Sequence, residues 1–275
     1  MRTYCFTFLL LLAFATAGAQ TTVSATDILR QVAAGEDVRL NGVTITGDLD
    51  FTRLPERRST QKGYGGSQQH WTYPIRVALT FVDCTFAGDV WGFRIEQKDK
   101  DYKGGQAHKA EFHEDVLFRG CRFEEDVNFK YSTFLADADF PAARFEEYAG
   151  FKYTKFSDDA DFSEIEVDGD ANFKYTEFAG AVDMSDAVFG DLAEFKYTDF
   201  EDRVTFANAV FRDDAVFKYV KFPAGVDMTK ARFERDADFK YAKFRRPAVF
   251  EGTDWGRDAD FKYTQLDGKP FRGGE

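Results

Sequence analysis

From Leu40 to the C-terminal end, apart from two insertions, the chain places one large apolar residue every five or six positions, and the two intervals alternate. From Phe129 onward, every fourth such position begins a Phe-Lys-Tyr triplet, and these triplets follow one another at intervals of 22 residues. The phenylalanines of the seven triplets are Phe129, Phe151, Phe173, Phe195, Phe217, Phe239 and Phe261. Neither the period of a helix nor the alternation of a long strand produces this rhythm. Because a fixed period is typical of repeat proteins, the pattern predicts a coil with four short extended faces per turn.

Four large residues per turn are expected to point into this coil. In the first two turns these are Leu40, Ile45, Phe51 and Ile75, then Phe81, Phe86, Phe93 and Phe112, and the regular turns begin at Phe118. A small residue precedes most triplets by two positions, as Ala171 does, and threonine takes the same offset on the next face, as at Thr176. Residues two apart in an extended segment share a side. We therefore expect one large and one small inward residue on each face.

The regions outside the coil predict a leader and a cap. Residues 1–19 contain Arg2, an apolar run and the Ala17-Gly18-Ala19 sequence, which together predict a cleaved signal peptide. Residues 20–37 predict a short capping helix with Ser24 or Thr26 as its N-cap. The coil is expected over residues 38–271, with loop insertions at 52–74 and 94–109, and residues 272–275 form a tail.

Units such as Ala-Asp-Phe-Lys-Tyr at 237–241 and Ala-Asn-Phe-Lys-Tyr at 171–175 carry a resemblance. The chain resembles the pentapeptide-repeat family, with phenylalanine in place of the commoner leucine and with every second unit six residues long. The resemblance implies an all-β fold, a right-handed quadrilateral β-helix of about nine coils of about 22 residues. No cap is evident after Leu266, and the family often associates end to end. A homodimer through the C-terminal end of the coil is therefore expected.

Net charge and the lengths of the apolar segments indicate which partners and which cellular compartment to expect. The formal net charge is −12 and the isoelectric point is about 4.9, which argues against nucleic-acid binding by the whole surface. The apolar run of the leader is too short to span a membrane, and no later segment is long enough. The sequence thus predicts an exported protein, periplasmic or extracellular, without membrane insertion.

The lysine and tyrosine of each triplet should point outward and form two parallel columns on one face. The central members of these columns, taken as candidate binding residues, are Lys152, Tyr153, Lys174, Tyr175, Lys196, Tyr197, Lys218 and Tyr219. One interpretation is a solvated wall in which the rings stack for stability and the lysines keep the surface soluble. The other is an aromatic and cationic strip that accepts a sugar polymer or an anionic chain. Both remain open.

The two insertions are basic, whereas the rest of the chain is acidic. Residues 52–76 contain five basic residues against one acidic residue, and residues 94–109 contain five against three. Both insertions leave the coil at the same corner, so they should project beside the columns, and Arg57, Arg58 and Trp71 are further candidate binding residues. Loops on rigid scaffolds often carry function, although simple tolerance of an insertion is an equal alternative.

Cys84 and Cys121 occupy the same small inward position in adjacent turns. Strands in adjacent turns lie about 4.8 Å apart, which is inside the range of Cα separations that a disulfide spans. A disulfide between Cys84 and Cys121 and a pair of buried free thiols are both compatible with this placement.

The sequence lacks the motifs expected of an enzyme. His70, His108 and His113 have no metal-ligand spacing, and no nucleophile motif or phosphate-binding glycine loop occurs. We therefore expect no catalytic site, metal or cofactor. The favoured function is a secreted, non-enzymatic scaffold that engages an envelope polymer or protein. Two alternatives are an acidic inhibitor that mimics DNA and a polysaccharide-acting enzyme built on a β-helix.

Overall fold

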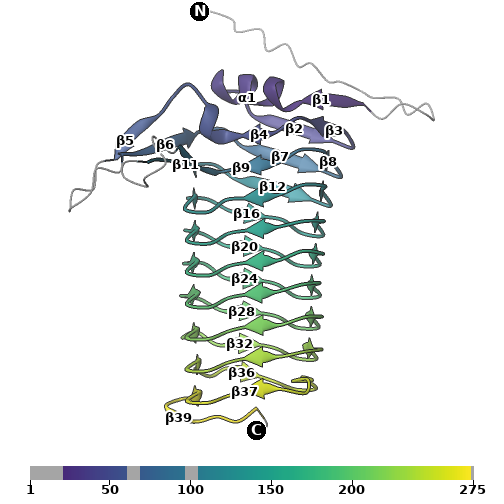
Figure 1. The fold of residues 1–275 in the computed structure, drawn as a ribbon, viewed down its shortest axis with the longest axis vertical. Helices are drawn as coiled ribbons and strands as arrows, with labels where there is room; N and C mark the ends of the chain where they lie inside the picture. The colour runs from purple at the N-terminus through teal and green to yellow at the C-terminus, as the bar shows by residue number, and fades with distance from the viewer. Residues whose placement is uncertain (1–20, 61–68, 97–104, 274–275) are drawn as a thin grey trace, which may run out of the picture.

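The computed structural model describes residues 21–60, 69–96 and 105–273, so the predicted signal peptide lies outside the described residues. Figure 1 shows coils stacked into a rod, with the helix α1 at one end and the C-terminus at the other. Each regular coil adds one short strand to each of four faces, and neighbouring coils pair in parallel. The predicted quadrilateral β-helix is therefore confirmed.

We number the faces in chain order. Face 1 consists of two successive sheets. The first contains β2 (Val38–Asn41), β7 (Leu79–Val82), β12 (Val116–Arg119) and β16 (Ala138–Asp139), and the second contains β20 (Ala160–Asp161), β24 (Val182–Asp183), β28 (Val204–Thr205), β32 (Val226–Asp227) and β36 (Ala248–Val249). Face 2 consists of β1 (Thr22–Ser24), β3 (Thr44–Thr46), β8 (Thr85–Phe86), β13 (Arg122–Phe123), β17 (Arg144–Phe145), β21 (Glu166–Val167), β25 (Val188–Phe189), β29 (Val210–Phe211) and β33 (Arg232–Phe233).

Face 3 precedes the Phe-Lys-Tyr corner, and face 4 follows it. Face 3 consists of β4 (Leu49–Asp50), β9 (Val90–Trp91), β14 (Val127–Asn128), β18 (Ala149–Gly150), β22 (Ala171–Asn172), β26 (Ala193–Glu194), β30 (Ala215–Val216), β34 (Ala237–Asp238) and β37 (Ala259–Asp260). Face 4 consists of β5 (Arg58–Thr60), β6 (Gln69–Ile75), β10 (Phe93–Glu96), β11 (Gln106–Phe112), β15 (Thr133–Phe134), β19 (Lys155–Phe156), β23 (Glu177–Phe178), β27 (Asp199–Phe200), β31 (Lys221–Phe222), β35 (Lys243–Phe244), β38 (Gln265–Leu266) and β39 (Lys269–Pro270).

Stacked phenylalanine rings fill the interior of the rod. The Phe195 ring lies 5.0 Å from the Phe173 ring and 4.8 Å from the Phe217 ring, between centroids, and the three rings are nearly parallel. The Phe206 ring, from face 1, meets Phe195 edge-on at 5.5 Å. All four side chains are fully buried. Aromatic pairs favour parallel-displaced and edge-to-face contacts, so this core satisfies both preferences at once.

The small inward positions complete the packing and satisfy buried polar groups. Ala171 is buried beside the Phe173 ring, as expected from the two-residue offset. The buried Thr176 hydroxyl donates a hydrogen bond of 2.6 Å to the Phe151 carbonyl of the preceding coil. Thr154, Thr198 and Thr264 make the same bond to Phe129, Phe173 and Phe239. A buried hydroxyl needs such a partner, so threonine at this position also ties adjacent coils together.

The inward position predicted for Phe93 is wrong. Val90 pairs with Val127, and the Gly92 amide donates to the Asn128 carbonyl, which places Gly92 opposite the inward Phe129. A Cβ on Gly92 would lie 2.6 Å from the Phe129 ring, so that ring occupies the space a side chain would need. Phe93 is buried, at 6% exposed, but lies outside the hydrophobic cluster of the rod interior and contacts Tyr131, with ring centroids 5.1 Å apart.

The N-terminal end is capped by the predicted helix. Helix α1 (Ala25–Ala33) begins after Ser24, whose side chain accepts a hydrogen bond from the Asp27 amide, and Ile28 and Val32 are buried against the first coil. Gly35 follows the helix with a φ of +76°, a conformation that glycine adopts readily. Within the described ranges, no helix is long and apolar enough to cross a membrane.

The expected absence of a C-terminal cap is also wrong. Strands β38 and β39 form an antiparallel hairpin at the end of the rod. The Phe271 side chain is 3% exposed and contacts the rings of Phe244, Phe250 and Phe261. Asp267 and Gly268, with φ of +49° and +78°, form the two-residue turn of this hairpin, which brings the tail back over the last coil. Phe250 and Phe261 remain half-buried, so the cover is partial.

Candidate binding surfaces

The Lys/Tyr columns follow a tight turn that every regular coil repeats after face 3. The amide of the residue that follows each tyrosine bonds back to the triplet's phenylalanine carbonyl, as Thr198 does to Phe195 at 3.0 Å. Each tyrosine occupies the left-handed region, with φ between 58° and 63°. Where the coil has Asn or Asp before the phenylalanine, its side chain accepts from the lysine amide, as Asn172 does from Lys174. The turn therefore fixes both outward side chains.

The seven tyrosine rings form one continuous stack. Their centroids are separated by 4.7 or 4.8 Å at each of the six steps, and the first five steps deviate from parallel by at most 8°. Each inner ring thus has both faces covered by its neighbours, although Tyr175 and Tyr197 are still 36% and 37% exposed. The stack presents ring edges and hydroxyl groups to solvent. A sugar that needs an aromatic face finds none along the inner column.

The lysines lie over the tyrosines of their own coils. The distance from Lys Nζ to the neighbouring ring centroid is 5.4 Å for Lys152, 6.0 Å for Lys174, 5.4 Å for Lys196 and 5.7 Å for Lys218, within reach of a cation–π interaction. Lys174 also pairs with Glu194 at 3.1 Å, and that hydrogen bond raises the Lys174 pKa. In the described part of the chain, Lys152, Lys196 and Lys218 form no ion pair, so their charges are available to a ligand.

Like charges along the lysine column affect its first member. Burial, and secondarily the neighbouring Lys152 ammonium, lower the pKa of Lys130. Both causes disfavour the charged form, and an added negative charge would offset the second. An anion bound beside Lys130 and Lys152 would therefore reduce an existing repulsion.

A shallow groove runs beside the tyrosine column on the face 4 side. Its volume is about 440 Å³, and it is lined by Tyr197, Tyr219, Tyr241, Asp199, Lys221 and Lys243. Its lining combines three tyrosines with two lysines and one aspartate, so the groove carries one net positive charge.

The backbone alone does not require tyrosine at this corner. The corner after face 1 has the same left-handed residue, with φ between 55° and 59° over five consecutive coils. Those five positions hold Ala142, Glu164, Asp186, Asn208 and Lys230. One chain therefore carries two corners of the same geometry, one chemically varied and one uniform. Left-handed conformations cost energy for a non-glycine residue at both corners, so the uniform tyrosine and lysine need another explanation.

The two insertions are largely strands where they are described, and the first of them begins with a short 3-10 helix, η1 (Phe51–Arg53). Strands β5 and β6 form an antiparallel hairpin, β10 and β11 form another, and β6 pairs in parallel with β11. We call these four strands the flap. It projects from the N-terminal part of the rod (Figure 1). Phe93, the first residue of β10, covers the first ring of the tyrosine column, so the flap adjoins the columns as expected from their shared corner.

The three flap residues predicted as binding residues differ in availability. Arg58 forms an ion pair with Glu111 of the adjacent coil, so its charge is neutralised. The Arg57 guanidinium lies 4.2 Å from the Trp71 ring centroid, and Arg57 forms no ion pair among the described residues. Trp71 is half-buried and donates its indole N–H to Gln106 at 3.0 Å. Arg57 on its tryptophan support is thus the available cation of this group.

Sequence reasoning missed a buried polar pair in the flap. The Tyr73 hydroxyl and His108 Nδ1 are 2.8 Å apart, and both side chains are at least 97% buried. A signal was present, because counting back by twos from the inward Ile75 reaches Tyr73, and counting back by twos from Phe112 reaches His108. Both residues therefore share the inward side of long strands that extend beyond the coil.

Cys84 and Cys121 lie side by side as free thiols in the interior. A hydrogen bond from the Cys121 thiol lowers the pKa of Cys84 to about 7, whereas the same contact and burial raise that of Cys121. The disulfide remains a prediction. In the described ranges, no group of histidine, cysteine and acidic residues is placed to hold a metal ion.

Comparisons with known proteins bear on the coil. The family model described as pentapeptide repeats (nine copies) matches residues 107–155, 151–199, 195–243 and 229–272. Searches of curated proteins and of solved structures find no significant match. The matched segments together extend over the regular coils that carry the Lys/Tyr columns.

Proposed function

Because the chain belongs to the pentapeptide-repeat family, whose fold is a repeat scaffold, we propose that it is a non-enzymatic interaction protein that binds a linear anionic polymer along the Lys/Tyr columns. The uniform Lys and Tyr at one corner, against varied residues at the matching corner of face 1, carry this proposal. Such a ligand would lie parallel to the rod axis and contact several coils at once. We further propose, from residues 1–19, that it does so after export.

Ring orientation favours an anionic polymer over a neutral carbohydrate. Neutral sugars gain affinity by stacking on aromatic faces, and the inner faces of the column are occupied by neighbouring rings. Tyrosine rings repeat at a spacing of 4.7–4.8 Å along the column. Their hydroxyls, together with the ammonium groups of Lys152, Lys196 and Lys218, suit carboxylate or sulfate groups on a regular chain. Attraction between exposed charges is weakened by salt, so binding should fall as ionic strength rises.

Polygalacturonate is a suitable test polymer, with dextran as the neutral control. The triple substitution Lys152→Gln, Lys196→Gln and Lys218→Gln should weaken binding about tenfold, since each exposed ion pair contributes roughly 0.2–1 kcal/mol. The matched control is Arg122→Gln, Arg212→Gln and Arg232→Gln, which removes three cations from face 2. It should leave affinity within twofold. Biolayer interferometry at two salt concentrations would measure both.

The tyrosines are tested separately. Replacing Tyr175, Tyr197 and Tyr219 by Asn should preserve the fold, because Asn208 already occupies the equivalent position at a φ of 59°, and should also weaken polymer binding. The proposal fails if wild-type protein does not bind polygalacturonate or binds dextran equally well. It also fails if the face 2 control loses as much affinity as the lysine triple variant.

A further inference from the structure

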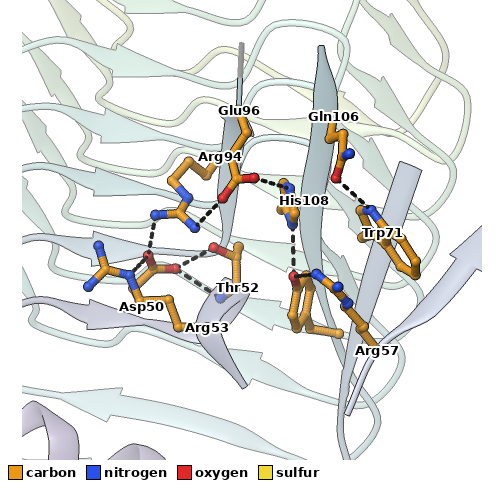
Figure 2. Close-up of polar contacts among 10 residues, drawn as sticks. Asp50, Thr52, Arg53, Arg57, Trp71, Arg94, Glu96, Gln106 and His108 are labelled. Carbon is orange, nitrogen blue, oxygen red and sulfur yellow. Dashed lines mark hydrogen bonds and ion pairs between the residues drawn. The ribbon is translucent and has the colours of Figure 1, made fainter. Parts of the chain in front are cut away.

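A second polar site lies beneath the flap, on the side opposite the columns. A cavity of about 390 Å³ is lined by Arg53, Arg57, Tyr73, Arg94, Glu96 and His108, with Thr52, Leu54 and Pro55 at its wall. Residues Asp50 to Arg53 provide the coil side of this site and β10 and β11 the flap side (Figure 2). Adjacent residues of a strand point to opposite sides, so Phe93 faces the tyrosine column while Arg94 faces this cavity.

Two of the three arginines already have acidic partners. Asp50 is buried, and its carboxylate accepts from the Thr52 amide at 2.9 Å and from Arg53 Nε at 2.9 Å. Arg94 donates to Glu96 at 3.0 Å, with its other terminal nitrogen 3.7 Å from Asp50 (Figure 2). These contacts orient Arg53 and Arg94 and neutralise their charges, so the net charge of the site comes from the third arginine.

Arg57 is that third arginine, and it is held in place without being neutralised. Its guanidinium rests on Trp71, and its Nη1 lies 3.5 Å from the Tyr73 hydroxyl. Trp71 is itself fixed by its hydrogen bond to Gln106 (Figure 2). Three guanidinium groups therefore face two carboxylates in the described residues of the cavity. A planar, preoriented guanidinium is suited to bind carboxylate or phosphate through two parallel hydrogen bonds.

His108 supplies an unpaired polar atom at the cavity wall. Its side chain is 2% exposed, its Nδ1 contacts the Tyr73 hydroxyl, and its Nε2 has no hydrogen-bond partner among the described residues. A Glu96 carboxylate oxygen lies 3.6 Å away, a contact drawn in Figure 2 that is within ion-pair distance but beyond hydrogen-bond range. Buried polar atoms in folded proteins are nearly always paired, so this nitrogen indicates a missing partner.

We propose that this cavity binds a small hydroxylated anion, with its carboxylate or phosphate on Arg57 and its hydroxyl groups toward Glu96 and His108. The volume is in the range of small-molecule sites and accommodates a single acidic sugar. The site is separate from the columns, so it stands or falls independently of the polymer-binding proposal.

Three sugars that differ at one carbon provide matched probes: galactose, galacturonate and galactose 6-phosphate. Isothermal titration calorimetry on the full chain should show at least one of the two anionic sugars binding ten or more times tighter than galactose. Which anion binds tighter distinguishes a carboxylate ligand from a phosphate ligand. Arg57→Gln should reduce that affinity at least tenfold, which corresponds to about 1.4 kcal/mol.

The neighbouring arginine provides the control variant. Arg58→Gln removes the same charge one residue away, from a side chain that pairs with Glu111 and does not line the cavity, and should change affinity less than twofold. Arg57→Lys keeps the charge but loses the planar fork, and should also weaken binding; it serves as the test if circular dichroism shows Arg57→Gln to be unfolded. The proposal is overturned if neither anionic sugar binds at millimolar concentration, if galactose binds equally, or if Arg58→Gln is as damaging as Arg57→Gln.

Discussion

At the scale of single residues, the coil fixes the backbone conformation and surroundings of each position. At several positions these are unfavourable for the residue present. Tyr197 accepts a left-handed backbone and gains two ring contacts in return. The Asp139 carboxylate on face 1 accepts a hydrogen bond of 3.3 Å from the Asp161 amide, and the carboxylates of Asp161 and Asp137 lie nearby. Burial, and then the neighbouring carboxylates, raise its pKa from 3.8 to about 6. Ionisation of Asp139 therefore costs more free energy in the folded protein than in the unfolded chain.

The sign of this shift predicts that Asp139→Asn stabilises the protein at neutral pH. Asn keeps an oxygen that can accept the Asp161 amide and removes the charge. The folded pKa lies above the unfolded value, so the cost of ionisation is fully present above pH 6 and disappears as pH falls toward 4. The full shift would correspond to about 3 kcal/mol, and solvent screening of this half-exposed group reduces our expectation to about 1 kcal/mol.

Urea unfolding of both proteins at about pH 7.5 and about pH 4 would measure this difference. A gain in the free energy of unfolding that is the same at both pH values would contradict it, because an uncharged effect of the amide has no reason to depend on pH.

At the scale of elements, the repeat predicted the stacked interior because phenylalanine spacing is the direct consequence of one strand per face. The expectation for Phe93 was wrong because Phe93 is the large apolar residue, whereas the spacing of the repeat falls on its neighbour Gly92. Gly92 follows Phe86 by six residues, the interval of the rhythm, and Phe93 follows it by seven. The flap strands were hidden for a different reason: their residues are mostly polar, and their pairing depends on two insertions meeting in space. The contact between Arg57 and Trp71 depends on the same pairing of the flap strands and could not be read from the sequence.

The corrected register predicts unequal effects for two phenylalanines. Phe195→Ala should lower the free energy of unfolding by about 3–5 kcal/mol, because Phe195 is fully buried between two parallel rings. Phe93→Ala should cost less than half of this, since its ring, although buried, packs against Tyr131 outside the interior cluster and is not held between two stacked rings.

Denaturant unfolding of the two single variants against wild type would measure both. Equal losses in the free energy of unfolding would indicate that Phe93 packs in the interior and would contradict the register that Gly92 defines.

At the scale of the whole molecule, the two ends differ in how well they are closed. Helix α1 buries its apolar side on the first coil, whereas the C-terminal hairpin covers the last coil through Phe271 and leaves Phe250, Trp255 and Phe261 half-buried. The end-to-end dimer was expected from an open end. The partial cover leaves the dimer as a proposal and places the contact on those three side chains.

Removing residues 267–275 should expose these rings and shift the protein toward a dimer. Hydrophobic association grows with the apolar area removed from water, so the truncated chain should dimerise at lower concentration than the full chain. Light scattering coupled to size-exclusion chromatography would measure the mass of both. A strictly monomeric mass for both proteins at high concentration would exclude association through this end.

The near identity of the interior coils makes the molecule a ruler. Excising residues 195–216 would join Glu194 to Phe217 and keep the spacing of the Phe-Lys-Tyr units, so Phe173 would stack on Phe217, while Met184 would meet Met228 in place of Phe206. One lysine and one tyrosine would leave the outer surface, while the helix, the flap and the final hairpin would be retained. Rod length and the number of outward lysine and tyrosine pairs are thus counted in whole coils, and insertion or loss of one repeat changes each of them by one fixed increment.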